Sequence, residues 1–217
     1  MKIYTSVPGG EKTEKVREYK LGIMIPTSPN WLPSRSLGEF DCALDNGAFR
    51  CFERGFPFME RRFLDTLDAC YTSGISLDFI VAPDIVGGGV ESLDFSMEWA
   101  NGRLRGCKSL ALAVQDGMMQ SDISTDVLDL FSHIFIGGTP GWKWRTAGGW
   151  CKFAHDNHKL CHIGQCGTLP NLTLAREHGV DSVDSSSFVR NDSWHILDVF
   201  LGRKTLFDVG EPQKEGK

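Results

Sequence analysis

Eight short apolar runs rich in β-forming residues recur along the 217-residue chain, and they limit its possible folds more than any other feature. The predicted strands span residues 2–7, 21–26, 42–48, 77–83, 109–114, 133–137, 160–164 and 182–188. Segments with helical spacing lie between them, as parallel strands require, because a parallel connection needs a crossover of a dozen or more residues. We therefore predict an α/β fold, a compact (β/α)8 barrel of the TIM type, with an open parallel sheet as the alternative.

The barrel is predicted to form a single domain over residues 1–210, because no linker or repeat divides the chain. Two connecting segments carry an apolar stripe with steps of three and four, which is typical of an amphipathic helix. These stripes are Met59, Phe63, Leu67, Cys70 and Leu93, Met97, Ala100, Leu104. His178-Gly179 predicts a helix end, and the charged segment 211–217 is expected to be a flexible tail.

Composition excludes several classes of protein. The chain carries 28 acidic and 23 basic residues, a net charge of -5, which argues against a surface coated in cations for nucleic acid. No apolar stretch approaches the roughly 18 residues of a membrane span, and the N-terminus does not resemble a secretory signal. The seven cysteines include no CxxC pair, so we expect reduced thiols in a cytoplasmic protein.

Polar residues follow most of the predicted strands, at the end where a barrel of this type carries its functional groups. They are Asp45, Asp84, Gln115 with Asp116, Gln165 and Asp184. Carboxylates gathered in a partly dry cleft repel one another, so that one stays ionised as a nucleophile while another carries a proton. This division of roles suits displacement at the anomeric carbon of a sugar. The alternative is structural: Asp45-Asn46-Gly47 as a turn and Asp84 as a helix N-cap.

Glycines suggest places where a ligand can approach the backbone. Gly137-Gly138 follows a predicted strand, and its N–H groups are candidates to hold an oxygen or a phosphate, although a plain tight turn is the alternative. Gly87-Gly88-Gly89 lacks the Lys-Ser/Thr of a P-loop and the dinucleotide fingerprint, which disfavours nucleotide binding of those types.

Two further clusters have residue types that suit ligand binding. Trp142, Lys143, Trp144 and Arg145 place indoles beside cations, a combination that stacks on bases and pairs with phosphates; the alternative is a loop that caps the barrel. His158, Cys161, His162 and Cys166 have tempting spacing for a metal site. On a strand, however, neighbouring residues point to opposite faces, so we predict structural thiols, a packed histidine and no metal site.

Taken together, the strand-end motifs resemble those of the tRNA-guanine transglycosylase superfamily. Asp45-Asn46-Gly47-Ala48-Phe49 is similar to that family's Asp-Ser-Gly-Gly-Phe, Val114-Gln115-Asp116-Gly117 to its Val-Gln-Gly-Gly, and residues 179–184 to its Gly-Val-Asp-x-x-Asp nucleophile segment. Ala82-Pro83-Asp84 resembles the segment of the base-recognising Asp, Ile136-Gly137-Gly138 the Gly-Gly turn, and His162-Ile163-Gly164 the later strand. The match runs in order over residues 40–190.

The resemblance implies a role for each matching residue. Asp184 would be the nucleophile at C1′ and Asp45 the acid/base. The guanine would be held by Asp84, Gln115 and the Gly137-Gly138 turn, with Phe49 at the same site. A carboxylate nucleophile fits this chemistry, as in retaining glycosidases. The exchange would need no metal or redox cofactor.

The chain also departs from the family pattern. No cysteine follows Asp184, whereas the transfer-RNA enzymes carry a zinc subdomain there. Asn46, Ala48 and Asp116 replace the family's Ser, Gly and Gly. The reduced form looks most like the DpdA-type DNA 7-deazaguanine transglycosylases of phages and bacterial DNA-modification clusters. That resemblance implies DNA and a 7-deazaguanine such as preQ0 as partners, in the cytoplasm of a cell or of a phage's host.

Three other functions remain open at this stage. The same exchange on tRNA, with a partner subunit, is the first, and a non-catalytic barrel that serves as a binding subunit is the second. The third is an unrelated barrel enzyme for a small sugar phosphate, with Gly137-Gly138 as its phosphate cradle. The sequence does not decide between a monomer and a homodimer.

Overall fold

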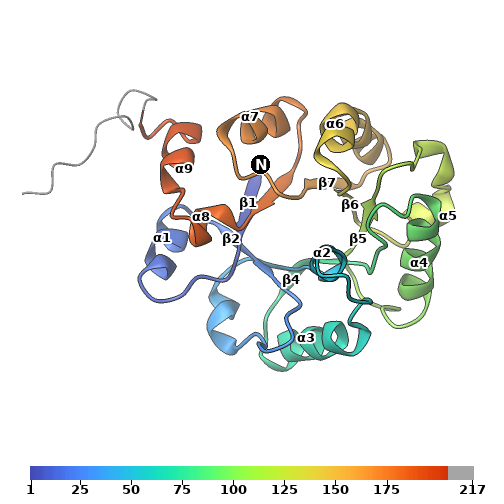
Figure 1. Cartoon of the computed structure of the whole chain (residues 1–217), viewed down its shortest axis with the longest axis horizontal. Helices are drawn as coiled ribbons and strands as arrows, with labels where there is room; N and C mark the ends of the chain where they lie inside the picture. The colour runs from blue at the N-terminus through green and yellow to red at the C-terminus, as the bar shows by residue number, and fades with distance from the viewer. Residues whose placement is uncertain (205–217) are drawn as a thin grey trace, which may run out of the picture.

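The computed structural model describes residues 1–204 and contains a closed barrel of eight parallel strands, in the order β1 to β8 (Figure 1). The predicted barrel fold is therefore confirmed. The strands are β1 (Lys2–Thr5), β2 (Gly22–Ile25), β3 (Cys42–Leu44), β4 (Leu77–Val81), β5 (Leu110–Val114), β6 (His133–Ile136), β7 (Leu160–Ile163) and β8 (Ser182–Ser185). The predicted tail, 211–217, and the last part of the predicted domain lie outside the described residues.

Helices surround the barrel and connect its strands (Figure 1). They are α1 (Lys12–Glu18), α2 (Ala48–Glu53), α3 (Glu60–Thr72), α4 (Val90–Asn101), α5 (Thr125–Leu128), α6 (Pro140–Asp156), α7 (Leu169–Glu177), α8 (Ser187–Arg190) and α9 (Trp194–Phe200). Short 3-10 turns span Arg35–Glu39 and Gln120–Asp122. Within the described part of the chain, every helix is too short or too polar to cross a membrane.

All eight predicted strands exist; most end one or two residues earlier than predicted, and two end three or four residues earlier. The strand predicted over 42–48 stops at Leu44, because Gly47 takes a left-handed conformation (φ 80°) and α2 begins at Ala48. The strand predicted over 182–188 stops at Ser185, and Ser187 opens α8. In both places a short polar turn connects the strand to a short helix at the mouth of the barrel.

The two predicted amphipathic helices are confirmed as α3 and α4. Phe63, Leu67 and Cys70 are buried on one side of α3. Leu104 is buried as predicted, but it lies beyond the end of α4 at Asn101. The predicted helix end at His178-Gly179 is also observed, with Gly179 at φ 75° after α7.

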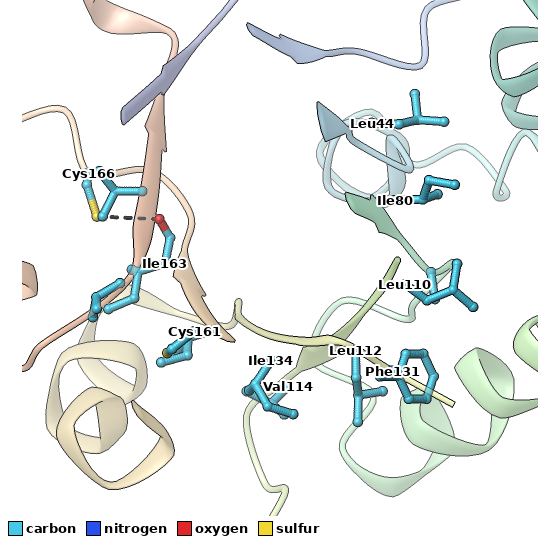
Figure 2. Packing of buried hydrophobic residues seen from close by; sticks show 14 of the residues in the cluster. Leu44, Ile80, Leu110, Leu112, Val114, Phe131, Ile134, Cys161, Ile163 and Cys166 are labelled. Atoms are coloured by element: carbon cyan, nitrogen blue, oxygen red, sulfur yellow. Dashed lines mark hydrogen bonds between the residues drawn. The ribbon is translucent and has the colours of Figure 1, made fainter. Parts of the chain in front are cut away.

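The core has two layers, one on each side of the sheet. The larger layer lies between strands and helices and includes Leu44, Ile80, Leu112, Ile134 and Ile163 (Figure 2). The smaller layer fills the barrel interior and consists of Tyr4, Ala43, Phe79, Val81, Ala111 and Ala113, with Met24 and Phe135 packed against it. The interior is thus packed below the mouth, so a ligand can enter only from the strand ends.

Candidate active site

Strand alternation brings the predicted polar residues to one place. Ala43, Ala113 and Phe135 face the barrel interior. Successive side chains on a strand point to opposite faces, so the residue two positions later faces inward as well. These later residues are Asp45, Gln115 and Gly137, and the same step leads from His162 to Gly164 and from Ser182 to Asp184. The carboxyl ends of neighbouring strands therefore present a ring of functional groups to the barrel axis.

These residues line a cavity of about 150 Å³ at the mouth of the barrel. Asp45, Asp84 and Asp184 share it, although they come from the ends of β3, β4 and β8. The other predicted base-contacting residues also line it, namely Phe49, Gln115, Gly137 and Gly138. Met24, Val81, Ala113 and Phe135 supply an apolar floor. Three carboxylates around an apolar floor suit a flat, partly polar ligand.

Asp45 is the carboxyl most affected by its surroundings. Burial raises its pKa to about 7, and the negative charges of Asp184 and Asp84 act in the same direction. Hydrogen bonds from the backbone N–H groups of Gly47 and Asn46 oppose this rise. A carboxyl with a pKa near neutrality can both give and take a proton at physiological pH, which is the requirement for an acid/base catalyst.

Asp84 is held by two amide side chains. Asn46 donates from Nδ2 to Asp84 Oδ1 (2.7 Å) and also to the carbonyl of Ala82, while Gln115 donates from Nε2 to Asp84 Oδ2. Burial raises the pKa of Asp84 to about 6 despite these bonds. A carboxylate has about four acceptor positions, so lone pairs remain for a ligand. Asn46 thus fixes the orientation of Asp84.

His162 contacts the candidate nucleophile. It is fully buried in the barrel interior, where its ring stacks on Phe135 (4.8 Å between centroids). Its Nε2 donates to Asp184 Oδ1 (3.1 Å), and its Nδ1 lies 2.8 Å from the Ser182 hydroxyl. The sequence predicts this residue only as a packed histidine. His162 lies two residues before Gly164 on a predicted strand, so both residues face the barrel interior, and this spacing could have placed His162 below the mouth.

Lys143 is a buried cation on the same cavity. It lies in the first turn of α6, and its Nζ donates to the carbonyl of Gly164 at the end of β7 (2.8 Å). Burial lowers the pKa of the ammonium, while the neighbouring Cys166 and Asp184 oppose that change. An ammonium here offsets part of the repulsion among the three carboxylates.

The turn after β6 requires glycine at position 138 and leaves little space for a side chain at position 137. Gly138 has φ 76°, and a Cβ there would lie 2.5 Å from Asp116 Oδ2 and 2.8 Å from the ring of Trp142. A Cβ on Gly137 would lie 2.8 Å from Gln115 Nε2. Thr139 donates to Asp116 from its backbone N–H and from its hydroxyl, both at 2.7 Å. Burial acts to raise the pKa of Asp116, but these bonds outweigh it and hold the pKa below its usual range.

The predicted nucleic-acid-binding segment differs from expectation. Trp142, Lys143, Trp144 and Arg145 belong to α6, so the alternative, a loop that caps the barrel, is wrong. Lys143 faces the cavity, because its long apolar stem lies buried and its ammonium bonds Gly164. Trp142 and Trp144 are half-buried against the core, and Arg145 alone is exposed. Lys143 is therefore buried away from the surface where a phosphate backbone would lie, and the nucleic-acid role of this segment stays a prediction.

The His/Cys segment divides between two faces. Cys161 lies in the layer between strands and helices, whereas His162 lies inside the barrel. Gln165, which the sequence places after β7, is exposed at the rim of the cavity with φ 64°. Across residues 1–204, no group of three or more His, Cys, Asp or Glu side chains is arranged to hold a metal ion.

No protein-family model matches the chain, and no curated protein matches it. The resemblance of the strand-end motifs therefore rests on the residues that carry it.

Proposed function

We propose that the protein is a guanine transglycosylase that exchanges guanine in DNA for a 7-deazaguanine base such as preQ0. One observation carries the proposal: Asp45, Asp84 and Asp184, the three residues with distinct roles in that chemistry, line a single cavity at the C-terminal mouth of the barrel. The motif resemblance, over residues 40–190 in order, supports it independently.

The reaction proceeds in two displacements at C1′ of the target nucleoside. Asp184 attacks C1′ through a carboxylate oxygen, the C1′–N9 bond breaks, and guanine leaves with the proton that Asp45 supplies. The deazaguanine then enters, and Asp45 takes the proton from its N9. That nitrogen attacks C1′, the C1′–O bond to Asp184 breaks, and both carboxyls return to their starting state.

Recognition of the purine uses the polar groups beside the two catalytic carboxyls. Asp84 accepts hydrogen bonds from the purine N1–H and the exocyclic amine, because its orientation is fixed by Asn46 and Gln115. The second N–H of the Gln115 amide and the backbone N–H of Gly138 hold the O6 oxygen. Phe135 and Val81 form part of the apolar floor on which the purine ring rests.

The contacts of the Gly137-Gly138 turn argue against the alternative function, an enzyme for a small sugar phosphate. A phosphate cradle at Gly137-Gly138 needs free N–H groups and a positive surround. Here the backbone N–H of Thr139 already donates to Asp116, whose negative charge lies against Gly138. An anion at this turn would meet a carboxylate, so a neutral purine is the better occupant.

Covalent trapping tests the proposal. The protein is incubated with a guanine-containing DNA strand or with tRNA, without any deazaguanine, and is then denatured and resolved on a gel. We expect a covalent protein–DNA adduct with the wild type and none with Asp184→Ala or the isosteric Asp184→Asn. Addition of preQ0 should release the DNA, and mass spectrometry of its nucleosides should then detect the modified deoxynucleoside.

Asp181→Asn is a matched control, since Asp181 lies just before the start of β8, at the end of the strand away from the cavity. Its carboxylate forms hydrogen bonds with Cys161 and His155. It should form the adduct normally. An adduct on tRNA alone would replace DNA by RNA as the substrate. Absence of any adduct, with DNA and tRNA both tested, would reject base exchange and favour a non-catalytic barrel.

A further inference from the structure

Exposed large apolar side chains gather at the mouth of the barrel. Among the described residues, those at the mouth lie in segments that follow β2, β3, β4 and β5, namely Leu32, Phe49, Phe52, Phe56, Ile85, Val90 and Met119. Three phenylalanines fall in the eight-residue stretch 49–56, with 45%, 62% and 60% of their surface exposed. Exposed aromatic side chains that cluster beside a cavity are typical of a binding surface.

The phenyl rings of this stretch have free faces. Within residues 1–204, none of the three is paired with another aromatic ring. Ala48 and Cys51 are the buried residues of α2, and they hold the helix on the barrel. Phe49 and Phe52, three residues apart, therefore project from an adjacent, solvent-facing side.

Two cations accompany the rings. Arg50 and Arg54 form no ion pair with any carboxylate of the described chain, and the guanidinium of Arg50 contacts only the Ser28 hydroxyl (3.3 Å). Four other arginines of the described chain form ion pairs, among them Arg61 with Asp65 and Arg103 with Glu60. In a chain with a net charge of -5, unpaired cations beside aromatic rings favour a negatively charged partner with flat groups.

This surface is continuous with the candidate active site. Phe49 both lines the cavity and is exposed at its rim. Figure 1 shows α2 inside the ring formed by the outer helices, nearer the barrel axis than α3. A polymer lying along α2 would thus pass directly over the mouth that holds Asp45 and Asp184.

We propose that the segment Phe49–Phe56, which we call the α2 rim, holds single-stranded DNA on either side of the target nucleotide. Bases flanking the target stack on the phenyl rings, and Arg50 and Arg54 pair with the phosphates between them. The proposal rests on the proposed function, because an enzyme that works on a base must take it out of the stack or bind unpaired DNA. It replaces α6 by α2 as the nucleic-acid surface.

The charges favour DNA over a second copy of the chain as the occupant. A symmetric contact through α2 would bring the arginines of both copies to one interface, where Glu53 is the single carboxylate of the helix. A phosphate backbone satisfies both arginines without such repulsion. Stacking on phenyl rings is also tolerant of sequence, which suits the bases that flank a target site.

Binding of a fluorescent single-stranded DNA 12-mer with one guanine, followed by anisotropy, tests the proposal. The double variant Phe52→Ala/Phe56→Ala should bind about fivefold to 100-fold more weakly than the wild type, as expected for lost base stacking. Arg54→Ala should bind more weakly and reduce the slope of log K against log salt concentration by about 0.7. These residues are exposed, so thermal melting should stay unchanged.

Tyr71→Ala and Arg105→Ala serve as matched controls, because this exposed aromatic ring and this cation lie together near the start of β4 and β5, at the opposite end of the barrel. Both should bind the DNA like the wild type. Equal binding by the α2-rim variants and the wild type would overturn the proposal. So would preference for a matched RNA strand, or a change in oligomeric state on sedimentation that accounts for the loss.

The outcome is separable from that of the proposed function. Formation of the Asp184 adduct together with unaffected binding by α2-rim variants would reject the α2 rim and leave base exchange standing. Loss of DNA binding in these variants, in a protein that forms no adduct, would support the surface and reject the chemistry.

Discussion

Two histidines inside the barrel differ in what they touch. His162, on β7, bonds Asp184 and Ser182. His133, on β6, packs its ring on Phe79 (4.8 Å between centroids) and contacts the Ser132 hydroxyl, away from the carboxylates. Burial lowers the pKa of His133 to about 4, so it is neutral at physiological pH. His162 therefore supports the site, whereas His133 only fills the interior of the barrel.

His162→Phe should lower the rate of adduct formation about 10-fold to 100-fold, because it removes the hydrogen bond that orients Asp184 while keeping a ring against Phe135. The KM for the incoming base should stay near that of the wild type, since the Asp84 side of the cavity is untouched. His162→Gln, which keeps a donor, should recover part of the rate. Single-turnover kinetics with the DNA strand would measure the rate of adduct formation, and steady-state turnover at varied base concentration would measure the KM.

His133→Phe is the control for interior packing, and it should leave the rate unchanged. A loss of the same size in His133→Phe and His162→Phe would mean that the effect comes from disturbed packing rather than from Asp184.

At the scale of elements, the turn between β6 and α6 joins three parts of the site. Gly138 and Thr139 contact Asp116 after β5, and Lys143 reaches from α6 to Gly164 after β7. The Cβ-free backbone of Gly138 allows both Asp116 and the Trp142 ring to approach it closely. A small change at this turn is therefore transmitted to two neighbouring strand ends.

Gly138→Ala should destabilise the protein by about 2–4 kcal/mol and raise the KM for the base, because the left-handed backbone strain and two close contacts add together. Gly179→Ala is a matched comparison, since Gly179 has nearly the same φ (75°) but no atom within 4 Å of the added Cβ. It should cost only about 1 kcal/mol, the strain contribution alone. Urea unfolding of both variants measures the difference, and equal costs would contradict the steric explanation.

The elements of the fold were largely predictable because they rest on local pattern. Each predicted strand is present, and the stripe of Phe63, Leu67 and Cys70 is buried in α3. The strand ends were less predictable. Ala48 and Ser187 begin helices within a few residues of a strand, and such a change depends on the conformation of the turn rather than on periodicity.

The site was predictable where strand alternation decides it, as for Asp45 and Asp184. It was not predictable where a long side chain reaches across elements. A lysine is normally expected at the surface. Only the packing of α6 against β7 shows that the ammonium of Lys143 points into the cavity. The exposure of Phe52 and Phe56 was equally hidden, because an apolar residue is normally assigned to the core.

For the whole molecule, the cluster of carboxyls lowers stability at high pH. From about pH 4 to pH 7 the folded protein keeps a proton on Asp45 that the unfolded chain has already released, so stability falls as the pH rises through this window. Asp84 acts in the same direction up to about pH 6. Buried His133 acts oppositely between about pH 4 and 6.5, because only the unfolded chain takes up its proton there.

Asp45→Asn isolates the first of these contributions, since Asp84 and His133 are common to both proteins. The variant should become more stable relative to the wild type as the pH rises from 5 to 8, by roughly 1–3 kcal/mol. This lies below the full value for the shift at 1.36 kcal/mol per pKa unit, because the carboxyl faces an open cavity. Urea unfolding at both pH values measures the change, with Asp94→Asn on the exposed face of α4 as the control.

If Asp45→Asn has the same advantage at both pH values, Asp45 does not titrate in this range and cannot be the acid/base. A stability gain matched by loss of adduct formation would instead show a catalytic carboxyl held in a destabilising environment for its function.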